Sequence, residues 1–335
     1  MDPITGTSRR NLLRACLGGA VAGRAQSQAG QAKACPTGGA CFSLPPKSRV
    51  AIARNPDAPP DASHLAALVD RAVAAACNRD SPQEAWKSIV RPGETVGLKV
   101  NCLSGRGGST SIALVEAICE RLQQAGIPAR NIVIWDRLTS DLEEAGHRTG
   151  NRKDGIRCIG NEAAGYESEL AIFGSVGSLL SKTLTRTCDA VINLPVLKDH
   201  GIVGVTMALK NLFGAIHNPN KYHLDGGDPY VADVYMLPPI RQKVRLTICD
   251  ALAPQYEGGP SYMPQWVWPY RGVLVSRDPV ALDATGWRII ERKRAELGLK
   301  PLREMKREPL YIARAADARH RIGASDPASI DVVEV

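Results

Sequence analysis

Hydrophobic and polar residues alternate along the chain with two different periods. In the first half, short segments repeat every second residue and longer ones every three or four, which predicts strands and helices respectively. Between residues 94 and 101, Val96 and Leu98 share one face, whereas Lys99 and Asn101 share the other. The pattern predicts strands over 49–53, 94–101 and 131–135, and helices over 62–77 and from the Gly-rich loop 104–110 to about residue 124.

The second half continues the same alternation. It predicts strands over 190–194, 244–249, 272–276 and 330–335, and helices over 202–216, 279–297 and 309–319. Strands that alternate with helices favour a parallel sheet with right-handed crossovers. We therefore expect an α/β fold, with a mostly parallel sheet flanked by helices, in a single large domain over 49–335 that could contain two subdomains. Ligands of such sheets bind outside the carboxyl ends of the strands.

The formal charge of +8 is unevenly distributed over the 335 residues. Residues 1–34 hold five basic residues and one acidic residue, so half of the excess lies in a tenth of the chain. The other residues have 37 basic and 33 acidic side chains, which gives no reason to expect nucleic acid as a partner. No apolar run reaches the roughly 18 residues of a membrane-spanning helix, so we expect no integral membrane segment.

Residues 1–34 resemble a twin-arginine signal peptide. Ser8-Arg9-Arg10-Asn11-Leu12-Leu13-Arg14 precedes a weakly apolar, uncharged stretch, and Ala32-Lys33-Ala34 has the form of a cleavage site. The resemblance implies recognition by the twin-arginine translocase and export to the periplasm, with a linker over 35–48 before the domain. Because that pathway carries folded proteins, it raises the expectation of a bound metal or prosthetic group. The alternative is a disordered basic tail.

Nine cysteines are spread along the chain without any C-x-x-C pair. A ferredoxin-type iron-sulfur motif and a zinc ribbon are therefore excluded. Cys35 and Cys41 could pair in an oxidising compartment. Most of the other cysteines stand in apolar runs, which predicts that they are buried as small hydrophobic residues.

The segment 189–219 contains the densest group of chemically active residues. We expect a strand that delivers Asn193, then a turn that displays Lys198, Asp199 and His200. On the predicted helix 202–216, Thr206 and Lys210 would share a face that continues to His217, with Asn211 next to Lys210. Burying so many cationic groups without an anion or a metal is costly, so the segment predicts a ligand site. The alternative is a solvated helix face after an ordinary turn.

Four segments together resemble a known family. They are V-G-L-K-V-N, D-A-V-I-N-L-P-V-L-K-D-H-G, A-L-K-N-L-F-G-A-I-H-N-P and S-R-D-P-V-A-L-D. They are similar to domain-of-unknown-function family 362 (DUF362), and the resemblance runs from about Arg49 to the end. It implies no established activity, because the family has none in general. Some members carry a twin-arginine leader and some an added ferredoxin module, of which this sequence has only the leader.

Other candidates lie at strand ends and in the Gly-rich loop. Lys99 and Asn101 precede that loop, whose backbone N–H groups, together with Arg106, could cradle an anion. The alternative is a flexible loop in which Thr110 caps the next helix. The remaining candidates are carboxylates. Asp136 and Asp250 end strands and could be metal ligands or general bases. Asp278 fits a helix N-cap before Pro279, whereas Asp283, within that helix, is a site candidate.

The histidines predict a tentative metal site. His217, His223, Asp225 and Asp228 share a turn-rich segment, so a site of two histidines and one carboxylate is possible there, with His200 as a further ligand. We expect the other three histidines, His64, His147 and His320, to be surface residues.

Aromatic residues concentrate in one Gly- and Pro-rich segment. Residues 256–270 hold five of the 16 aromatic residues of the chain: Tyr256, Tyr262, Trp266, Trp268 and Tyr270. They could form a lid over a ligand, cap the core, or meet a second subunit.

These observations support two hypotheses. The first is an exported enzyme whose basic, metal-capable cleft takes a small anionic substrate. Its catalytic candidates are Lys198, His200, Lys210, Asp250 and Asp283; its binding candidates are Lys99, Asn101, Arg106, Asn193 and Asn211; and its metal candidates are His200, His217 and His223. The second is a periplasmic protein that binds or delivers a ligand or cofactor without catalysis. The identity of any cofactor stays open, a divalent metal being one possibility.

Overall fold

The computed structural model describes residues 47–55 and 62–335, which belong to one compact unit. The predicted signal peptide, Cys35 and Cys41 lie outside the described residues, as does most of the predicted linker. No helix within the described ranges has the length and apolar character needed to cross a membrane.

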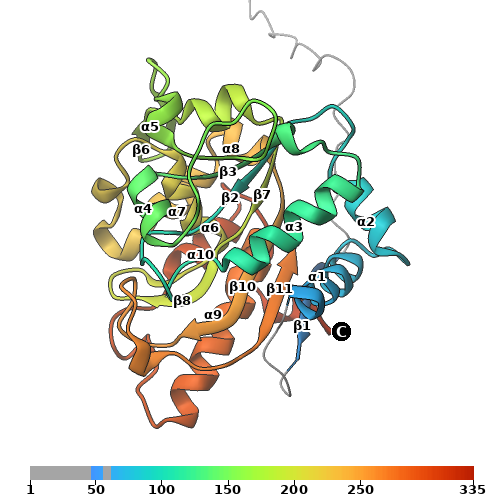
Figure 1. The fold of residues 1–335 in the computed structure, drawn as a ribbon. Coiled ribbons are helices and arrows are strands. Elements are labelled where there is room, and N and C mark those ends of the chain that lie inside the picture. The colour runs from blue at the N-terminus through green and yellow to red at the C-terminus, as the bar shows by residue number, and fades with distance from the viewer. Residues whose placement is uncertain (1–46, 56–61) are drawn as a thin grey trace, which may run out of the picture. The chain divides into compact units, whose positions relative to one another are not determined.

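A large mixed sheet forms the centre of the protein (Figure 1). Only β11 runs antiparallel to its neighbours, and the other pairs along the main path of the sheet are parallel. The mostly parallel α/β fold predicted from the sequence is therefore confirmed. In spatial order the strands are β12 (Ile330–Glu334), β1 (Ser48–Arg54), β11 (Gly272–Ser276), β10 (Val244–Gln255), β7 (Ala190–Asn193), β2 (Val96–Lys99), β3 (Ile132–Asp136) and β4 (Arg157–Gly160).

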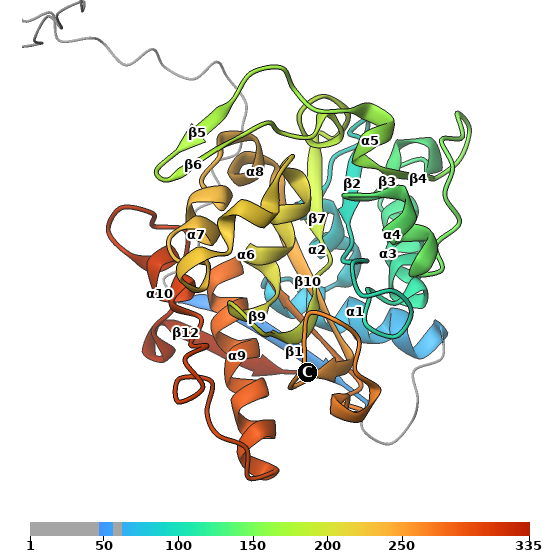
Figure 2. The same ribbon diagram turned by 90° about the vertical axis from the view of Figure 1, so that its left-hand side faces the viewer.

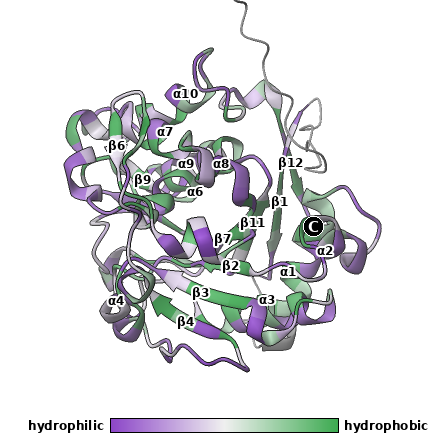
Figure 3. Ribbon diagram, turned by 90° about the horizontal axis from the view of Figure 1, so that it is seen from above, coloured by the Kyte–Doolittle hydropathy of each residue, from purple (hydrophilic) through white to green (hydrophobic). Residues whose placement is uncertain are grey.

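Helices cover both faces of this sheet, because each presents an apolar stripe to it. One face is covered by α1 (Ala62–Ala76), α2 (Pro82–Ile89) and α3 (Ile112–Gln124). The opposite face, which is turned toward the viewer in Figure 2, is covered by α6 (Ala208–Asn211), α7 (Tyr230–Tyr235), α8 (Pro238–Lys243), α9 (Pro279–Glu296) and α10 (Leu310–Ala316). The strands between them are mainly hydrophobic (Figure 3).

Smaller elements complete the described chain. Two short helices, α4 (Thr139–Glu144) and α5 (Asn161–Ala164), follow β3 and β4, and β5 (Ala171–Phe173) pairs with β6 (Val176–Ser178) in a separate hairpin. Asp278 accepts hydrogen bonds from the N–H groups of Val280 and Ala281, which confirms its predicted role as the N-cap of α9. The predicted burial of the cysteines is also confirmed for Cys102, Cys119, Cys158, Cys188 and Cys249.

The predicted helix 202–216 is wrong. The chain instead forms β8 (Val196–His200), which pairs with β10, and β9 (Gly204–Thr206), which turns back along β8. Gly204 makes this hairpin possible because its φ of +84° suits glycine and a Cβ there would collide with the backbone of Arg307. Only α6 and one 3-10 turn over Leu212–Ala215 remain helical, so Thr206, Lys210 and His217 do not share a continuous helix face.

Candidate functional site

A cavity of about 490 Å³ opens at the carboxyl ends of the central strands. The register of the sheet explains its position: Lys99 at the end of β2 pairs with Asn193 at the end of β7, and Asp136 ends the neighbouring β3. This is the edge at which open α/β sheets bind ligands. Of the residues predicted for a site, those that line the cavity are Lys99, Asn101, Asp136, Lys198, His200, Thr206, Lys210, Asn211 and His223.

Lys99 and Asp136 form a buried ion pair in the cavity wall. Lys99 Nζ lies 2.7 Å from Asp136 Oδ1 and also donates to the carbonyl oxygen of Val100 at 2.6 Å. Asp136 accepts two further hydrogen bonds, from the backbone N–H groups of Cys102 and Arg137. The pair is internally satisfied, so its charges hold the ends of β2 and β3 together instead of attracting a ligand.

Three asparagine side chains connect this pair to α6. Asn211 donates from Nδ2 to Asn193 Oδ1 at 2.8 Å and accepts from Asn101 Nδ2 at 3.1 Å. Asn193 is fully buried and donates to the carbonyl oxygen of Ala208, so it supports the cavity from behind without lining it. The strand end predicted to deliver a ligand contact therefore fixes the position of α6.

Lys198 is held by the Gly-rich loop. Its Nζ donates to Asn101 Oδ1, Ser104 Oγ and the carbonyl oxygen of Gly108, at 2.6 to 2.9 Å. Burial lowers the pKa of Lys198 to about 8. All three donors of its ammonium are used within the protein.

The predicted anion cradle of the Gly-rich loop is not formed. The loop presents oxygen atoms to Lys198, and a carboxylate of the protein itself, that of Asp250, accepts the N–H of Ser111 at the start of α3 at 2.8 Å. Arg106 is exposed and does not line the cavity. Thr110 does not cap α3 either, because its hydroxyl donates to the carbonyl oxygen of Leu194.

Lys210 differs from the other two buried lysines. It is only 8% exposed, and its Nζ, which lies 4.2 Å from the centroid of the Phe213 ring, has no hydrogen bond or ion pair anywhere in the described chain. Burial, together with the charge of Lys198, lowers the pKa of Lys210 to about 7. The cavity therefore contains a buried amine whose hydrogen-bonding capacity is unused.

Two histidines stack in the cavity and present different nitrogen atoms to it. His200 accepts at Nδ1 from the backbone N–H groups of Ile202 and Val203, at 3.2 and 3.4 Å, so its proton must be on Nε2. His223 Nδ1 lies 3.2 Å from the carbonyl oxygen of Asn220, which places the proton on Nδ1 and leaves a lone pair on Nε2. Burial lowers the pKa of both, that of His200 to about 2, so both rings are neutral near pH 7.

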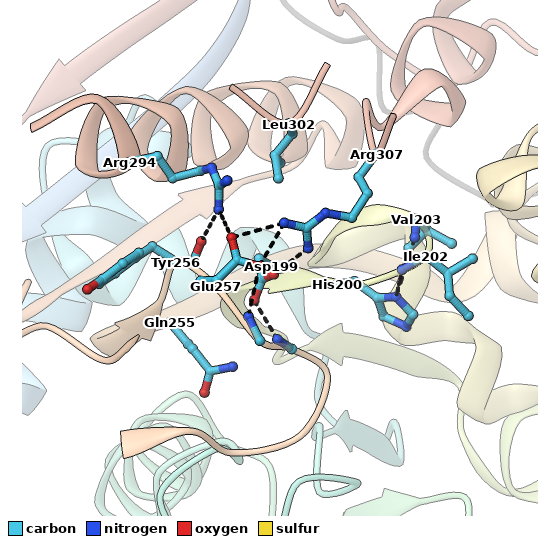
Figure 4. A network of polar contacts seen from close by, with 12 residues as sticks. Asp199, His200, Ile202, Val203, Gln255, Tyr256, Glu257, Arg294, Leu302 and Arg307 are labelled. Atoms are coloured by element: carbon cyan, nitrogen blue, oxygen red, sulfur yellow. Dashed lines mark hydrogen bonds and ion pairs between the residues drawn. The ribbon is translucent and has the colours of Figure 1, made fainter. Parts of the chain in front are cut away.

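An ion-pair network supports β8 from the side opposite the cavity (Figure 4). Side chains alternate along the strand, so Lys198 and His200 face the cavity whereas Asp199 points away from it. Asp199 accepts from the N–H of Gly259 at 2.7 Å and from Arg307 at 3.1 Å, and Arg307 also pairs with Glu257. The network thereby fixes the strand that carries two of the cavity residues.

Asp250 and Asp283, which the sequence predicted as catalytic groups, do not line the cavity. Besides Ser111, Asp250 accepts the N–H of Leu252 at 3.0 Å. Asp283 accepts the N–H groups of Ala208 and Leu209, at 2.7 and 3.2 Å, and so caps α6 from below. Burial raises the pKa of Asp283 to about 8. Both carboxylates hold backbone segments in place.

The predicted metal site is not assembled. His217 is exposed and packs edge-on against Tyr166, outside the cavity that contains His200 and His223. Asp228 pairs with Arg314 at 2.8 Å. Across residues 47–55 and 62–335, no group of three or more His, Cys, Asp or Glu side chains is arranged to hold a metal ion.

Two histidines predicted to be surface residues are buried. His147 is 8% exposed and its Nε2 has no partner among the described residues. His320 is 2% exposed and lies between Asp233 and Asp317, at 2.9 and 2.8 Å. Only His64 is exposed as predicted.

The aromatic segment caps the core, which was one of its three predicted roles. Tyr256 and Tyr270 are core residues, and Trp266 and Trp268 pack against the same cluster. Of this segment only Pro260 lines the cavity. None of the five aromatic side chains therefore lines the cavity.

Sequence reasoning missed several cavity residues. The most important is Arg137, whose guanidinium has no hydrogen bond or ion pair within the part of the chain that the structure describes. Its position directly after the strand-ending Asp136 was a usable signal. Phe213, which lies under Lys210, and the rim residues Leu103 and Ile202 had no such signal, because apolar residues of core and cavity look alike in sequence.

Fold and cavity together define an α/β protein with a cationic cavity at the carboxyl edge of its sheet. The chain belongs to the family described as "Domain of unknown function (DUF362)", whose profile matches residues 96–288. This confirms the family indicated by the four sequence segments. The matched range contains every residue that lines the cavity.

Two individual proteins are similar to the chain. The thylakoid-associated protein sll1697 of Synechocystis sp. is 30% identical over 153 residues, which is 42% of this chain and 45% of that protein. The match thus spans less than half of that relative. The lactate racemase apoprotein from Thermoanaerobacterium thermosaccharolyticum superposes with a TM-score of 0.43 and 9% identity, over 75% of this chain and 59% of that structure. This distant likeness assigns no role to any residue here.

Proposed function

We propose that the protein is an enzyme that binds a small anionic substrate in the cavity and moves a proton on it. The observation that carries the proposal is the state of Lys210. A buried ammonium that faces a cavity without a hydrogen-bond acceptor loses the hydration of its charge, and the cation–π contact of Lys210 with the Phe213 ring replaces only part of it. An anion in the cavity would supply that acceptor.

The neighbouring groups fit the same proposal. Arg137 offers a second cation: the cavity carboxylate Asp141 lies within its electrostatic influence, but the guanidinium forms no hydrogen bond or ion pair within the described residues. This planar group can bind a carboxylate or phosphate through two parallel hydrogen bonds. The Nε2–H of His200 is a neutral donor for a substrate oxygen. The free Nε2 of His223 can accept a proton, so it is the general base in this proposal.

The test measures anion binding before chemistry. Phosphate and propionate are titrated by calorimetry into the wild type, K210M, and K153M as the matched control, since Lys153 is exposed. We expect K210M to weaken binding about 10- to 100-fold, as for the loss of a charge-assisted hydrogen bond, and K153M to leave it unchanged. Equal affinities in all three proteins would contradict the proposal.

A screen of small carboxylates and phosphoesters then separates catalysis from binding. Conversion of a substrate that is lost in H223Q supports an enzyme with His223 as base. Binding without any conversion overturns the catalytic part and supports the alternative, a protein that binds or delivers its ligand unchanged.

We also propose that the protein reaches the periplasm by the twin-arginine pathway. The proposal is supported by the Ser8–Arg14 segment and by Ala32-Lys33-Ala34. Replacing Arg9 and Arg10 with lysine should retain the full-length precursor in the cytosol. Unchanged export of that variant would contradict the proposal.

A further inference from the structure

Three buried lysines surround the cavity, and their hydrogen bonding separates them into two kinds. Lys99 donates to Asp136, to the carbonyl oxygen of Val100 and to Asn211, and Lys198 likewise has three acceptors. Three acceptors favour the protonated form of each of these two side chains, and an ammonium has no lone pair with which to react. Lys210 has no such partner within the described residues and is more than nine-tenths buried. It is therefore the lysine of the cavity that is free to act as an amine.

The surroundings of Lys210 favour the amine form. Burial removes water from the Lys210 ammonium, and the cation Lys198 is close enough to disfavour a second charge. The cation–π contact with the Phe213 ring offsets only part of this loss. These two causes, burial and the charge of Lys198, lower the pKa of Lys210 to about 7. Near neutral pH, Lys210 is therefore unprotonated in about half of the molecules.

His200 and His223, which can donate and accept protons, line the same cavity as Lys210. The His223 ring packs edge-on against Phe213 with centroids 5.6 Å apart, which places its free Nε2 in the neighbourhood of Lys210. The Nε2–H of His200, whose ring stacks on that of His223, can donate to a carbonyl oxygen. Arg137 supplies a place for a carboxylate.

We infer that the ligand is a small oxo acid, a carboxylate that also carries a ketone or aldehyde, and that Lys210 condenses with this carbonyl to form an imine. The inference rests on the proposed function, because it names the class of anion that the cavity takes.

The chemistry balances without any further reactant. The Nζ lone pair attacks the carbonyl carbon while His200 Nε2–H hydrogen-bonds to the carbonyl oxygen. His223 Nε2 takes a proton from the attacking nitrogen and returns it to the oxygen. The carbinolamine then loses that oxygen as water, which carries both hydrogens of the amine, and a carbon–nitrogen double bond replaces the carbon–oxygen double bond.

Reductive trapping tests the inference directly. The full-length protein is incubated with pyruvate, glyoxylate or succinic semialdehyde in the presence of sodium cyanoborohydride, which reduces an imine to a stable secondary amine. Mass spectrometry of the intact chain and of its peptides then locates the adduct. We expect one adduct per chain on Lys210 with at least one probe, formed at least about tenfold faster than on exposed lysines because more of Lys210 is unprotonated.

The controls keep the two proposals separate. K210M should lose the rapid adduct and K153M should keep it, with circular dichroism showing that both variants are folded. If propionate and phosphate bind through Lys210 but none of the three probes is trapped there, the imine is overturned and the anion site stands. If neither anion binds and the labelling is spread evenly over exposed lysines, both proposals fail.

Discussion

The imidazole rings of His200 and His223 are stacked, with centroids 5.6 Å apart and planes inclined by 27°. The two residues come from different segments, the end of β8 and the turn after Tyr222, and each is fixed by backbone atoms of its own segment. The stack therefore places a hydrogen-bond donor and a proton acceptor next to each other in one cavity.

This arrangement predicts opposite tautomers for the two rings. His200 should be the Nε2–H tautomer because its Nδ1 accepts backbone N–H groups, and His223 the Nδ1–H tautomer because its Nδ1 faces a carbonyl oxygen. Nitrogen-15 imidazole spectra of the wild type, assigned with H200Q and H223Q, measure both. If both rings had the same tautomer, either the Nε2–H donor of His200 or the Nε2 base of His223 would be missing, which would contradict the proposed roles.

The second prediction concerns Asp283 as a structural cap. In D283A, two buried N–H groups of α6 lose their acceptor, so we expect a loss of about 2–4 kcal/mol in the free energy of unfolding. Urea denaturation measures this loss. The affinity of the folded variant for phosphate should stay within about twofold of that of the wild type, because Asp283 does not line the cavity and substitutions at separate sites act independently. A large loss of affinity with unchanged stability would instead make Asp283 a site residue.

Asp283 also predicts a pH dependence of stability. Its folded pKa of about 8 lies above the ordinary value of 3.8, so its contribution to stability is complete below 3.8 and is lost as the pH rises through 8. The free energy of unfolding of the wild type should therefore fall between pH 6 and pH 9 more steeply than that of D283N. Parallel curves for the two proteins would show that Asp283 is ionised in the folded state.

The buried pair of Lys99 and Asp136 should stabilise the fold only when both partners are present. Each single replacement leaves a buried charge without its partner, so K99M and D136L should each lose about 3–5 kcal/mol of stability. The double variant should be less destabilised than the sum of the two, since no charge is then left unpaired. A double-mutant cycle by chemical denaturation measures the difference, and strict additivity would contradict the structural role of the pair.

The sequence predicted the place of the site better than its chemistry. Lys99, Asp136 and Asn193 were identified because strand ends can be read from alternation, and the carboxyl ends of parallel strands meet at one edge. Whether a strand-end residue lines a cavity depends on which way its side chain turns. Asn193 and Asp250 turn inward and bond to backbone groups, which no local pattern reveals.

The segment 196–217 shows why local structure was mispredicted. Residues 202–209 are mostly apolar, and periodicity alone cannot distinguish a buried hairpin from a buried helix in such a run. The pairing of β8 with β10 decides the matter, through residues some 50 positions away. Consequently His200, at the end of a strand, lines the same cavity as Lys210. His217, which was predicted to share a helix face with Lys210, lies outside the cavity.

In the proposed function the Lys210 amine receives a small anion, so binding of the anion should be accompanied by uptake of a proton. With a pKa of about 7, Lys210 is mainly unprotonated at pH 8, and a bound anion stabilises its charged form, so propionate binding should take up close to one proton. Affinity should correspondingly fall as the pH rises through 7.

Calorimetry at pH 8 in two buffers of different ionisation enthalpy measures this uptake. We expect nearly one proton for the wild type and for K153M, and none for the residual binding of K210M. Propionate binding to the wild type without proton uptake would contradict the account, because it would mean that the anion does not meet Lys210.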